Sequence, residues 1–173
     1  KLWKDLNSSA LRAMHRDGIS RPSQIYLTAL KVAELLGDNL LIARTWYSLG
    51  NLHAPYDLDK AVEYYSNSYN KFLQICYWSD LVYVCADLSD VYNRKEVLTN
   101  AKIYADNAIK YRALVREDTP STKMWPADYG LACALVTKAS IAYQEGETIN
   151  AIQYARQAIS LYQDLERQKV YIP

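Results

Sequence analysis

The sequence predicts an all-α protein of about four antiparallel helix pairs, and three observations support this fold class. Apolar residues recur at helical spacing along nearly the whole chain. Small residues recur at the same depth in successive pairs, 39, 40 and 50 residues apart (Ala29, Ser68, Ala108 and Ala158). Five Gly and five Pro among 173 residues leave too few turns for a β-sandwich.

The repeat places the helices in order along a single domain, residues 1–173. Pro22 and Pro126 suit the first turn of a helix, and Ser79 is a candidate N-cap. Helices are therefore expected at about 2–15, 23–36, 40–53, 58–77, 80–93, 98–116, 127–145 and 148–168. The corresponding repeats are 2–38, 40–77, 80–116 and 127–168. The segment 116–128 is interpreted as an inserted loop, whose Met124 and Trp125 either pin it down or meet a partner.

Gly50 interrupts the helical stretch WYSLGNLHAPYDLDKAVEYY (46–65) and needs a physical reason. Gly costs about 1 kcal/mol relative to Ala in a helix interior. Two antiparallel helices approach to about 8–10 Å only where bulky side chains give way. Gly50 is therefore interpreted as a packing residue, at the same point of its helix as Ser89 and Ala139. The residues expected to face these three are Ala61, Ala101 and Ala151.

The residues around Gly50 resemble the tetratricopeptide repeat (TPR) signature, in which W-x2-L-G opens the first helix and A-x3-[FY] follows in the second. Three repeats carry the resemblance, through Trp46, Leu49, Gly50, Ala61 and Tyr65, through Leu88, Tyr92, Ala101 and Ala108, and through Ala139, Tyr143, Gly146, Ala151 and Ala158. Glu96 departs from the pattern, since a turn Gly is usual there.

The period near 40 residues is longer than the usual 34 and is similar to that of long-helix TPR regions in regulators and scaffolds. The resemblance implies a right-handed superhelix with a concave groove lined by the first helices. It also implies a fragment of a larger regulatory or scaffold protein. Because the chain begins at Lys1 rather than Met, we expect it to be an excised or processed fragment. A targeting signal or membrane anchor would then lie outside this sequence.

Composition excludes several classes of function. Twenty basic and 19 acidic residues give a formal net charge of +1, which argues against a nucleic-acid-binding domain. No apolar run reaches the ~20 residues that span a bilayer. Three scattered cysteines suit neither a disulfide framework nor a Cys-x-x-Cys metal site, and their odd number favours a reducing compartment. A cytoplasmic location is therefore expected.

The sequence shows little sign of catalytic or metal chemistry, so we expect no enzyme, no metal and no cofactor. His53 is interpreted as a packing residue, and His15 as a residue that favours the C-terminal dipole of its helix. Cys85 and Cys133 fall at apolar helix positions and are interpreted as small hydrophobic residues. Nucleotide-binding Gly-rich loops and nucleophile elbows are missing from the sequence.

A candidate binding groove lies on the first helices, beside the packing residues. Its expected residues, through which a protein or peptide partner would bind, are Arg44, Tyr47, Asn51, Tyr83, Asp90, Asn93 and Arg94. Asn side chains can pair with an extended peptide backbone, and neither Asn51 nor Tyr47 is expected to contribute to packing. TPR domains that clamp a terminal carboxylate use Lys, Asn and Arg, but here Tyr47 stands at the place of the Lys and Asp87 and Asp90 add negative charge. An acidic tail is therefore an unsuitable ligand.

The expected function is a non-catalytic interaction module, the sensing or recognition part of a larger regulator such as a bacterial signalling protein. Its partner is a protein or peptide, or another domain of the same chain. The alternative is a structural spacer or dimerisation scaffold without a groove ligand. The last helix favours a homodimer or a continuation, because Ile159, Leu161, Tyr162, Leu165 and Val170 exceed what its own partner helix can cover.

Overall fold

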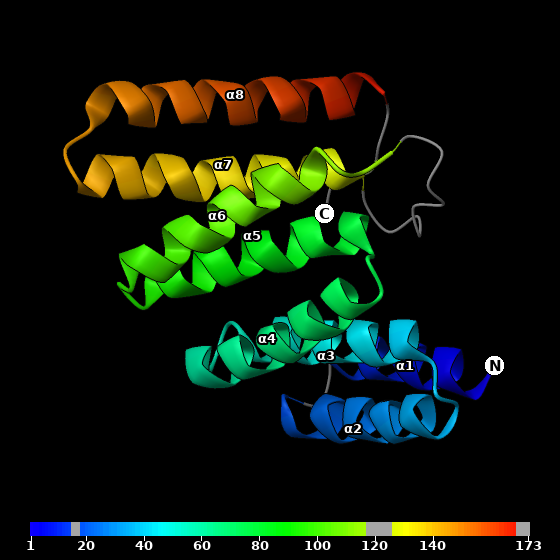
Figure 1. The fold of residues 1–173 in the computed structure, drawn as a ribbon. Helices are drawn as coiled ribbons and strands as arrows, with labels where there is room; N and C mark the ends of the chain where they lie inside the picture. Colours follow the sequence, from blue (N-terminus) through cyan, green and yellow to red (C-terminus); the bar gives the residue numbers. More distant parts are fainter. Residues whose placement is uncertain (15–17, 117–125, 169–173) are drawn as a thin grey trace. The chain divides into compact units, whose positions relative to one another are not determined.

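A computed structural model describes residues 1–14, 18–116 and 126–168, and within them the fold is entirely helical, as predicted (Figure 1). The described residues form eight α-helices that pack in neighbouring pairs. Their bounds are α1 Leu2–Met14, α2 Ser20–Leu35, α3 Asn39–His53, α4 Leu58–Gln74, α5 Trp78–Arg94, α6 Leu98–Arg112, α7 Ala127–Gln144 and α8 Thr148–Arg167. None of these helices is long and apolar enough to cross a membrane.

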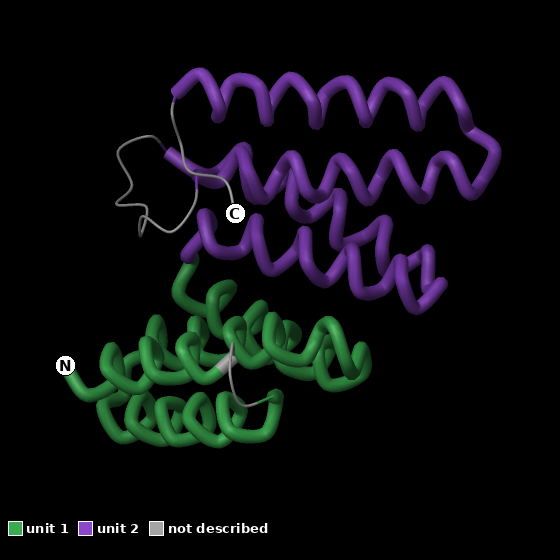
Figure 2. Tube along the Cα trace, turned by 180° about the vertical axis from the view of Figure 1, so that it is seen from behind, with its two compact units in different colours: residues 1–76 green, residues 77–173 purple. Residues whose placement is uncertain are grey.

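The chain divides into two compact units, residues 1–76 and 77–173 (Figure 2). The first unit contains the pairs α1/α2 and α3/α4, with α2 also packed against α3. The second contains α5/α6 and α7/α8, and α7 also packs against both α5 and α6. Each pair is an antiparallel hairpin because its two helices are joined by a short turn.

Helix ends follow local capping chemistry. The Asp38 carboxylate accepts hydrogen bonds from the backbone N–H of Leu40 and Leu41 and so caps α3. Asp57 caps α4 through Lys60 N–H. Ser79 is not an N-cap, contrary to expectation: α5 begins one residue earlier, at Trp78, and its N-cap position makes no side-chain hydrogen bond.

Two helices end earlier than the sequence predicted, α4 at Gln74 and α6 at Arg112. After α4, Cys76 adopts a left-handed backbone with φ 53°. Glu96 does the same after α5, with φ 59°, in the turn where a Gly is usual. The ends of α4 and α5 therefore form without the Gly that normally signals a helix end.

In the first unit, Gly50 packs against the ring of Tyr65 on α4. A Cβ at position 50 would come within 2.9 Å of Tyr65 Cγ and closer still to two other ring atoms. The packing role predicted for Gly50 is therefore correct, but the group that faces it most closely is Tyr65 rather than Ala61. Ser68 adds a polar link across the same pair, since its buried hydroxyl donates to Ala43 O at 2.9 Å.

In the second unit, Ser89 on α5 donates to Ala101 O on α6 at 2.8 Å, so these two predicted packing positions do meet. Three ion pairs join α6 to α7 or to Glu145, the residue that follows α7. Lys102 pairs with Glu145 at 2.6 Å, Lys138 pairs with Asp106, and Arg112 binds both carboxylate oxygens of Asp128 at 2.6 and 3.0 Å.

Some sequence predictions fall outside the described residues. His15, most of the 116–128 loop with Met124 and Trp125, and Val170 belong to this group.

Candidate functional site

The first candidate surface is the α3 face, which we define by Arg44, Tyr47 and Asn51. These residues are spaced three and four apart and therefore share one side of the helix. Arg44 and Tyr47 are partly buried, whereas Asn51 is exposed. The side-chain carbonyl Oδ1 of Asn51 accepts a 2.6 Å hydrogen bond from the hydroxyl of Tyr65. No described residue pairs with the Asn51 amide Nδ2.

The orientation of Asn51 follows from the packing of α3 against α4. Because Gly50 has no side chain, the Tyr65 ring can lie directly on α3. Tyr65 is only 3% exposed, so its position is fixed and its hydroxyl reaches Asn51. The hydroxyl holds the carbonyl end of the Asn51 carboxamide, which leaves the NH2 end as a donor at the surface.

The structure corrects the expectation that Tyr47 and Asn51 contribute nothing to packing. The Tyr47 ring centroid lies 5.8 Å from that of Tyr65, in a tilted arrangement. Asn51 satisfies the nearly buried hydroxyl of the same residue. Removing either side chain therefore disturbs the α3/α4 contact as well as the surface, and alanine variants are poor probes of binding alone.

The second candidate surface is the α5–α7 face, which we define by Asp90, Asn93, Arg94, Ser140 and Gln144. Asn93 Nδ2 donates to Ser140 Oγ at 3.3 Å, and Gln144 Nε2 donates to Asn93 Oδ1 at 3.4 Å. Arg94 and Asp90 form an exposed i, i+4 ion pair at 3.7 Å. Amides and one neutralised charge pair therefore dominate this face. Exposed Val136 and Tyr143 lie on the same side of α7 as Ser140.

Tyr83 was expected to face the groove, but it is a buried residue between α5 and α7. It is 9% exposed, its ring packs against Gly130, and its hydroxyl donates to Pro126 O. Burial and neighbouring Asp80 raise the pKa of its hydroxyl far above the usual range. Gly130 makes this possible, since a Cβ there would lie 3.2 Å from the Tyr83 ring. We therefore leave Tyr83 out of the binding surface.

Tyrosines also surround Cys133 in the second unit. The Tyr129 ring lies 6.3 Å from that of Tyr83 and 6.0 Å from that of Tyr162, centroid to centroid. The Cys133 sulfur lies 3.5 Å from the Tyr162 hydroxyl. Burial raises the pKa of the Cys133 thiol and raises that of Tyr129 to about 12. These groups stay protonated at neutral pH, which does not favour nucleophilic chemistry at Cys133.

Cys85 and His53, the other residues predicted to serve packing, are both buried. Cys85 is fully buried, and its thiol pKa is raised by that burial. His53 is 6% exposed, with its ring 5.1 Å from that of Tyr64 and its Nε2 3.5 Å from Ser23 Oγ. No described residue pairs with His53 Nδ1. Burial, followed by nearby Lys60, lowers the pKa of this imidazole.

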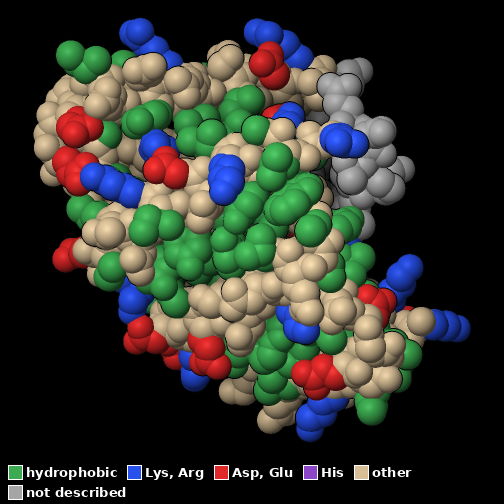
Figure 3. Space-filling model, viewed as in Figure 1, with side chains coloured by type: hydrophobic (Ala, Val, Ile, Leu, Met, Phe, Trp, Pro, Cys, Tyr) green, Lys and Arg blue, Asp and Glu red, His purple; other side chains and the backbone are tan. Residues whose placement is uncertain are grey.

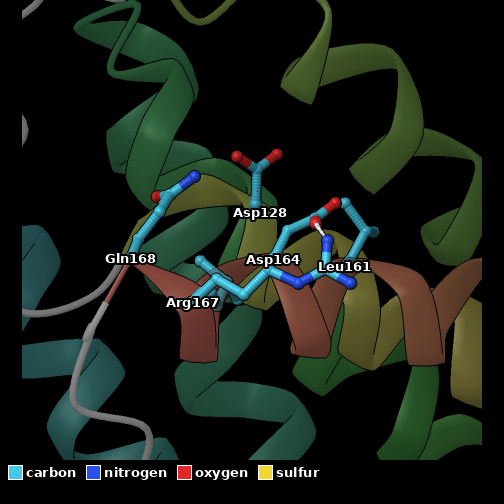
Figure 4. Close-up of a pocket in the computed structure, with 6 residues that line it drawn as sticks. Asp128, Leu161, Asp164, Arg167 and Gln168 are labelled. Carbon is cyan, nitrogen blue, oxygen red and sulfur yellow. Dashed lines mark hydrogen bonds and ion pairs between the residues drawn. The ribbon is translucent and has the colours of Figure 1, made fainter.

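A pocket of about 330 Å³ that sequence reasoning missed lies between the beginning of α7 and the end of α8 (Figure 4). It is lined by Asp128, Leu161, Asp164, Leu165, Arg167 and Gln168. Both carboxylates already bind guanidinium groups, Asp128 that of Arg112 and Asp164 that of Arg167 at 3.0 Å. The pocket therefore contains no free acid–base pair. Its residues come from helices more than 30 positions apart, so no local motif could indicate it.

The distribution of charge and of metal-ligating side chains bears on which ligands the surface could hold. On the face seen in Figure 3, Lys and Arg side chains alternate with Asp and Glu, and neither sign forms a continuous field. Among the described residues, no group of three or more His, Cys, Asp or Glu side chains could hold a metal ion. Neither a charged field on this face nor a metal-binding cluster among the described residues therefore indicates a ligand.

Together these features define an all-α protein of paired helices with polar faces on its first helices. No known protein family and no curated protein matches the chain. Among solved structures, it is similar to BtubC (BKLC) from P. vanneervenii, with a TM-score of 0.76 and 15% sequence identity. The likeness covers 99% of this chain and 66% of that protein. At this identity it shows the fold alone.

Proposed function

We propose that this chain is a non-catalytic, TPR-like interaction module that binds an extended peptide or protein segment on its first-helix faces. One observation carries the proposal: the exposed Asn51 carboxamide is held by the Tyr65 hydroxyl so that its NH2 end faces outward. A donor fixed in this way can pair with a backbone carbonyl at little cost in side-chain entropy. The Tyr47 ring beside it offers area for a ligand side chain.

The α5–α7 face supports the same kind of ligand in the second unit. Asn93 and Gln144 supply amides, and exposed Tyr143 and Val136 supply apolar area. The single charge pair, Arg94 with Asp90, is internally neutralised. A polar ligand of low net charge is therefore preferred, and its binding should depend only modestly on salt.

The same surfaces support a role as the recognition part of a larger, regulatory or signalling protein. The thiols of Cys85 and Cys133 have pKa values raised by burial, so they stay protonated at neutral pH and do not favour nucleophilic catalysis. The three cysteines are free thiols, which suits a reducing compartment such as the cytoplasm. The alternative remains a spacer or dimerisation scaffold without a ligand on these faces.

A selection with random peptides displayed on phage tests the proposal. Selected peptides are synthesised, and their dissociation constants are measured by fluorescence anisotropy. Asn51→Asp keeps an oxygen to accept the Tyr65 hydroxyl but removes the NH2 donor, so binding should weaken about tenfold. Asn70→Asp, on an exposed Asn of α4, makes the same chemical change away from the α3 face and should leave binding unaltered.

The aromatic contact has its own pair of variants. Tyr47→Leu keeps apolar bulk against Tyr65 but removes the aromatic ring, so it should weaken binding. Tyr56→Leu makes the same change at a 76% exposed tyrosine in the turn after α3 and serves as control. If no peptide is selected, or if the selected peptides bind the Asn51 and Tyr47 variants as tightly as the wild type, the ligand-binding proposal fails. The scaffold alternative then takes its place.

A further inference from the structure

α6 and α8 are the second helices of the pairs α5/α6 and α7/α8, so their residues can be compared position by position. The comparison indicates which side of α8 is suited to bind another helix. Ala108 on α6 and Ala158 on α8 occupy the same buried position, so corresponding residues differ by 50 in number. On α6, the residues that bind α7 through ion pairs are Lys102, Asp106 and Arg112. This side of α6 therefore holds the next helix of the fold.

The equivalent positions on α8 have a different chemistry. They carry Ile152, Arg156 and Tyr162, and between them lie Ala155 and Ile159. Ile152 and Ile159 are 48% and 54% exposed. Scattered exposed isoleucines are ordinary. Ile152, however, stands at the position of Lys102, which pairs with Glu145. Ile159 stands at the position of Ile109, which is itself 37% exposed but lies between the α7-binding residues Asp106 and Arg112. We call this side, with Glu166 one turn beyond Tyr162, the α8 stripe.

Charge decides which helix fits the α8 stripe. On α7 the residue opposite Asp106 is Lys138, so a helix that met Arg156 in the same way would need a carboxylate at the position of Lys138. The equivalent residues of the earlier first helices are Leu49 and Leu88. A head-to-tail contact with α3 or α5 of another copy would therefore leave Arg156 without a counter-charge.

α8 itself supplies the missing carboxylate. Arg156 and Glu166 lie on either side of Ile159 and Tyr162, about 15 Å apart along the helix. In an antiparallel pair, each Arg156 meets Glu166 of the other copy. Ile159 meets the part of Tyr162 that stays exposed, since the Tyr162 ring also packs on Tyr129 of its own α7. In a parallel pair, like charges would meet instead. We propose that the α8 stripe binds the α8 stripe of a second copy of this chain, antiparallel and about a twofold axis.

Sedimentation equilibrium from low-micromolar to near-millimolar concentration tests this inference. The wild type should fit a monomer–dimer equilibrium. Ile159→Lys should abolish the dimer, whereas Ile103→Lys, at a 51% exposed isoleucine of α6, should leave it intact. Arg156→Glu alone creates two like-charge contacts per dimer and should weaken association about tenfold. The double variant Arg156→Glu, Glu166→Arg should restore it.

Each other result overturns the inference. A chain that remains monomeric throughout shows that the α8 stripe serves another helix or stays exposed. A dimer that survives Ile159→Lys forms through a different surface. A dimer weakened by Arg156→Glu but not restored by the double variant is not antiparallel in this register. Circular dichroism of each variant verifies that it remains folded.

Discussion

Replacing Gly50 by Ala tests the link between helix packing and the candidate site. Helix propensity alone would favour the substitution by about 1 kcal/mol. Against this, the new Cβ would lie 2.9 Å from Tyr65 Cγ, near the base of the side chain, where the ring cannot move aside without leaving its buried place. Overpacking of this kind costs about 1–3 kcal/mol.

A displaced ring also breaks the 2.6 Å hydrogen bond from Tyr65 to Asn51, which adds about 1 kcal/mol. The net loss expected for Gly50→Ala is therefore about 1–3 kcal/mol. For a chain of this length, each 1 kcal/mol lowers Tm by about 2–4 °C. Urea unfolding followed by far-ultraviolet circular dichroism measures the loss, and hydrogen exchange should locate it in α3 and α4.

Two further variants separate the clash from general effects of the substitution. In a Tyr65→Leu background the ring is gone, so Gly50→Ala should become neutral or stabilising. Gly130→Ala meets its neighbours at 3.1 to 3.3 Å and should cost less than Gly50→Ala. The reasoning is refuted if Gly50→Ala stabilises the wild-type chain, or if Tyr65→Leu leaves its cost unchanged.

Three other predictions concern single side chains. Tyr65→Phe keeps the ring but frees the Asn51 carboxamide, so it should weaken binding of the selected peptides, measured by anisotropy, with a stability loss of only about 1 kcal/mol. His53 has a lowered pKa when folded, so the unfolded chain binds more protons; the free energy of unfolding should fall as pH drops below about 6.5, and less steeply in His53→Phe. Arg112→Leu leaves the half-buried Asp128 unpaired and should lower the free energy of unfolding by about 1 kcal/mol, a loss that Asp128→Asn should partly recover in the double variant.

Helical periodicity predicted every described helix, because apolar spacing is a property of the sequence alone. The ends of helices were less predictable. Cys76 and Glu96 adopt left-handed conformations without the Gly that would have signalled them, and Trp78 opens α5 without a side-chain cap. Trp78 instead stacks on the ring of Tyr111 on α6, with 5.7 Å between the centroids, and a local sequence pattern does not record such a contact.

The candidate site was predictable in part, for the same reason. The side of α3 with Tyr47 and Asn51 followed from helical spacing, but their contacts with Tyr65 required the position of α4. Tyr83 shares the spacing of a surface residue, yet Gly130 on a distant helix gives its ring a buried place. The hydrogen bond from Asn93 to Ser140 likewise joins residues far apart in sequence.

The most direct test of the central claim observes the Asn51 side-chain amide itself. In a 15N-labelled chain, the two Nδ2 protons give a resolved pair of signals that mutation can assign. On titration with a peptide from the selection, this pair should shift and its exchange with water should slow, while the signals of Asn70 stay in place. A peptide that binds at full occupancy without moving the Asn51 amide signals would contradict the account.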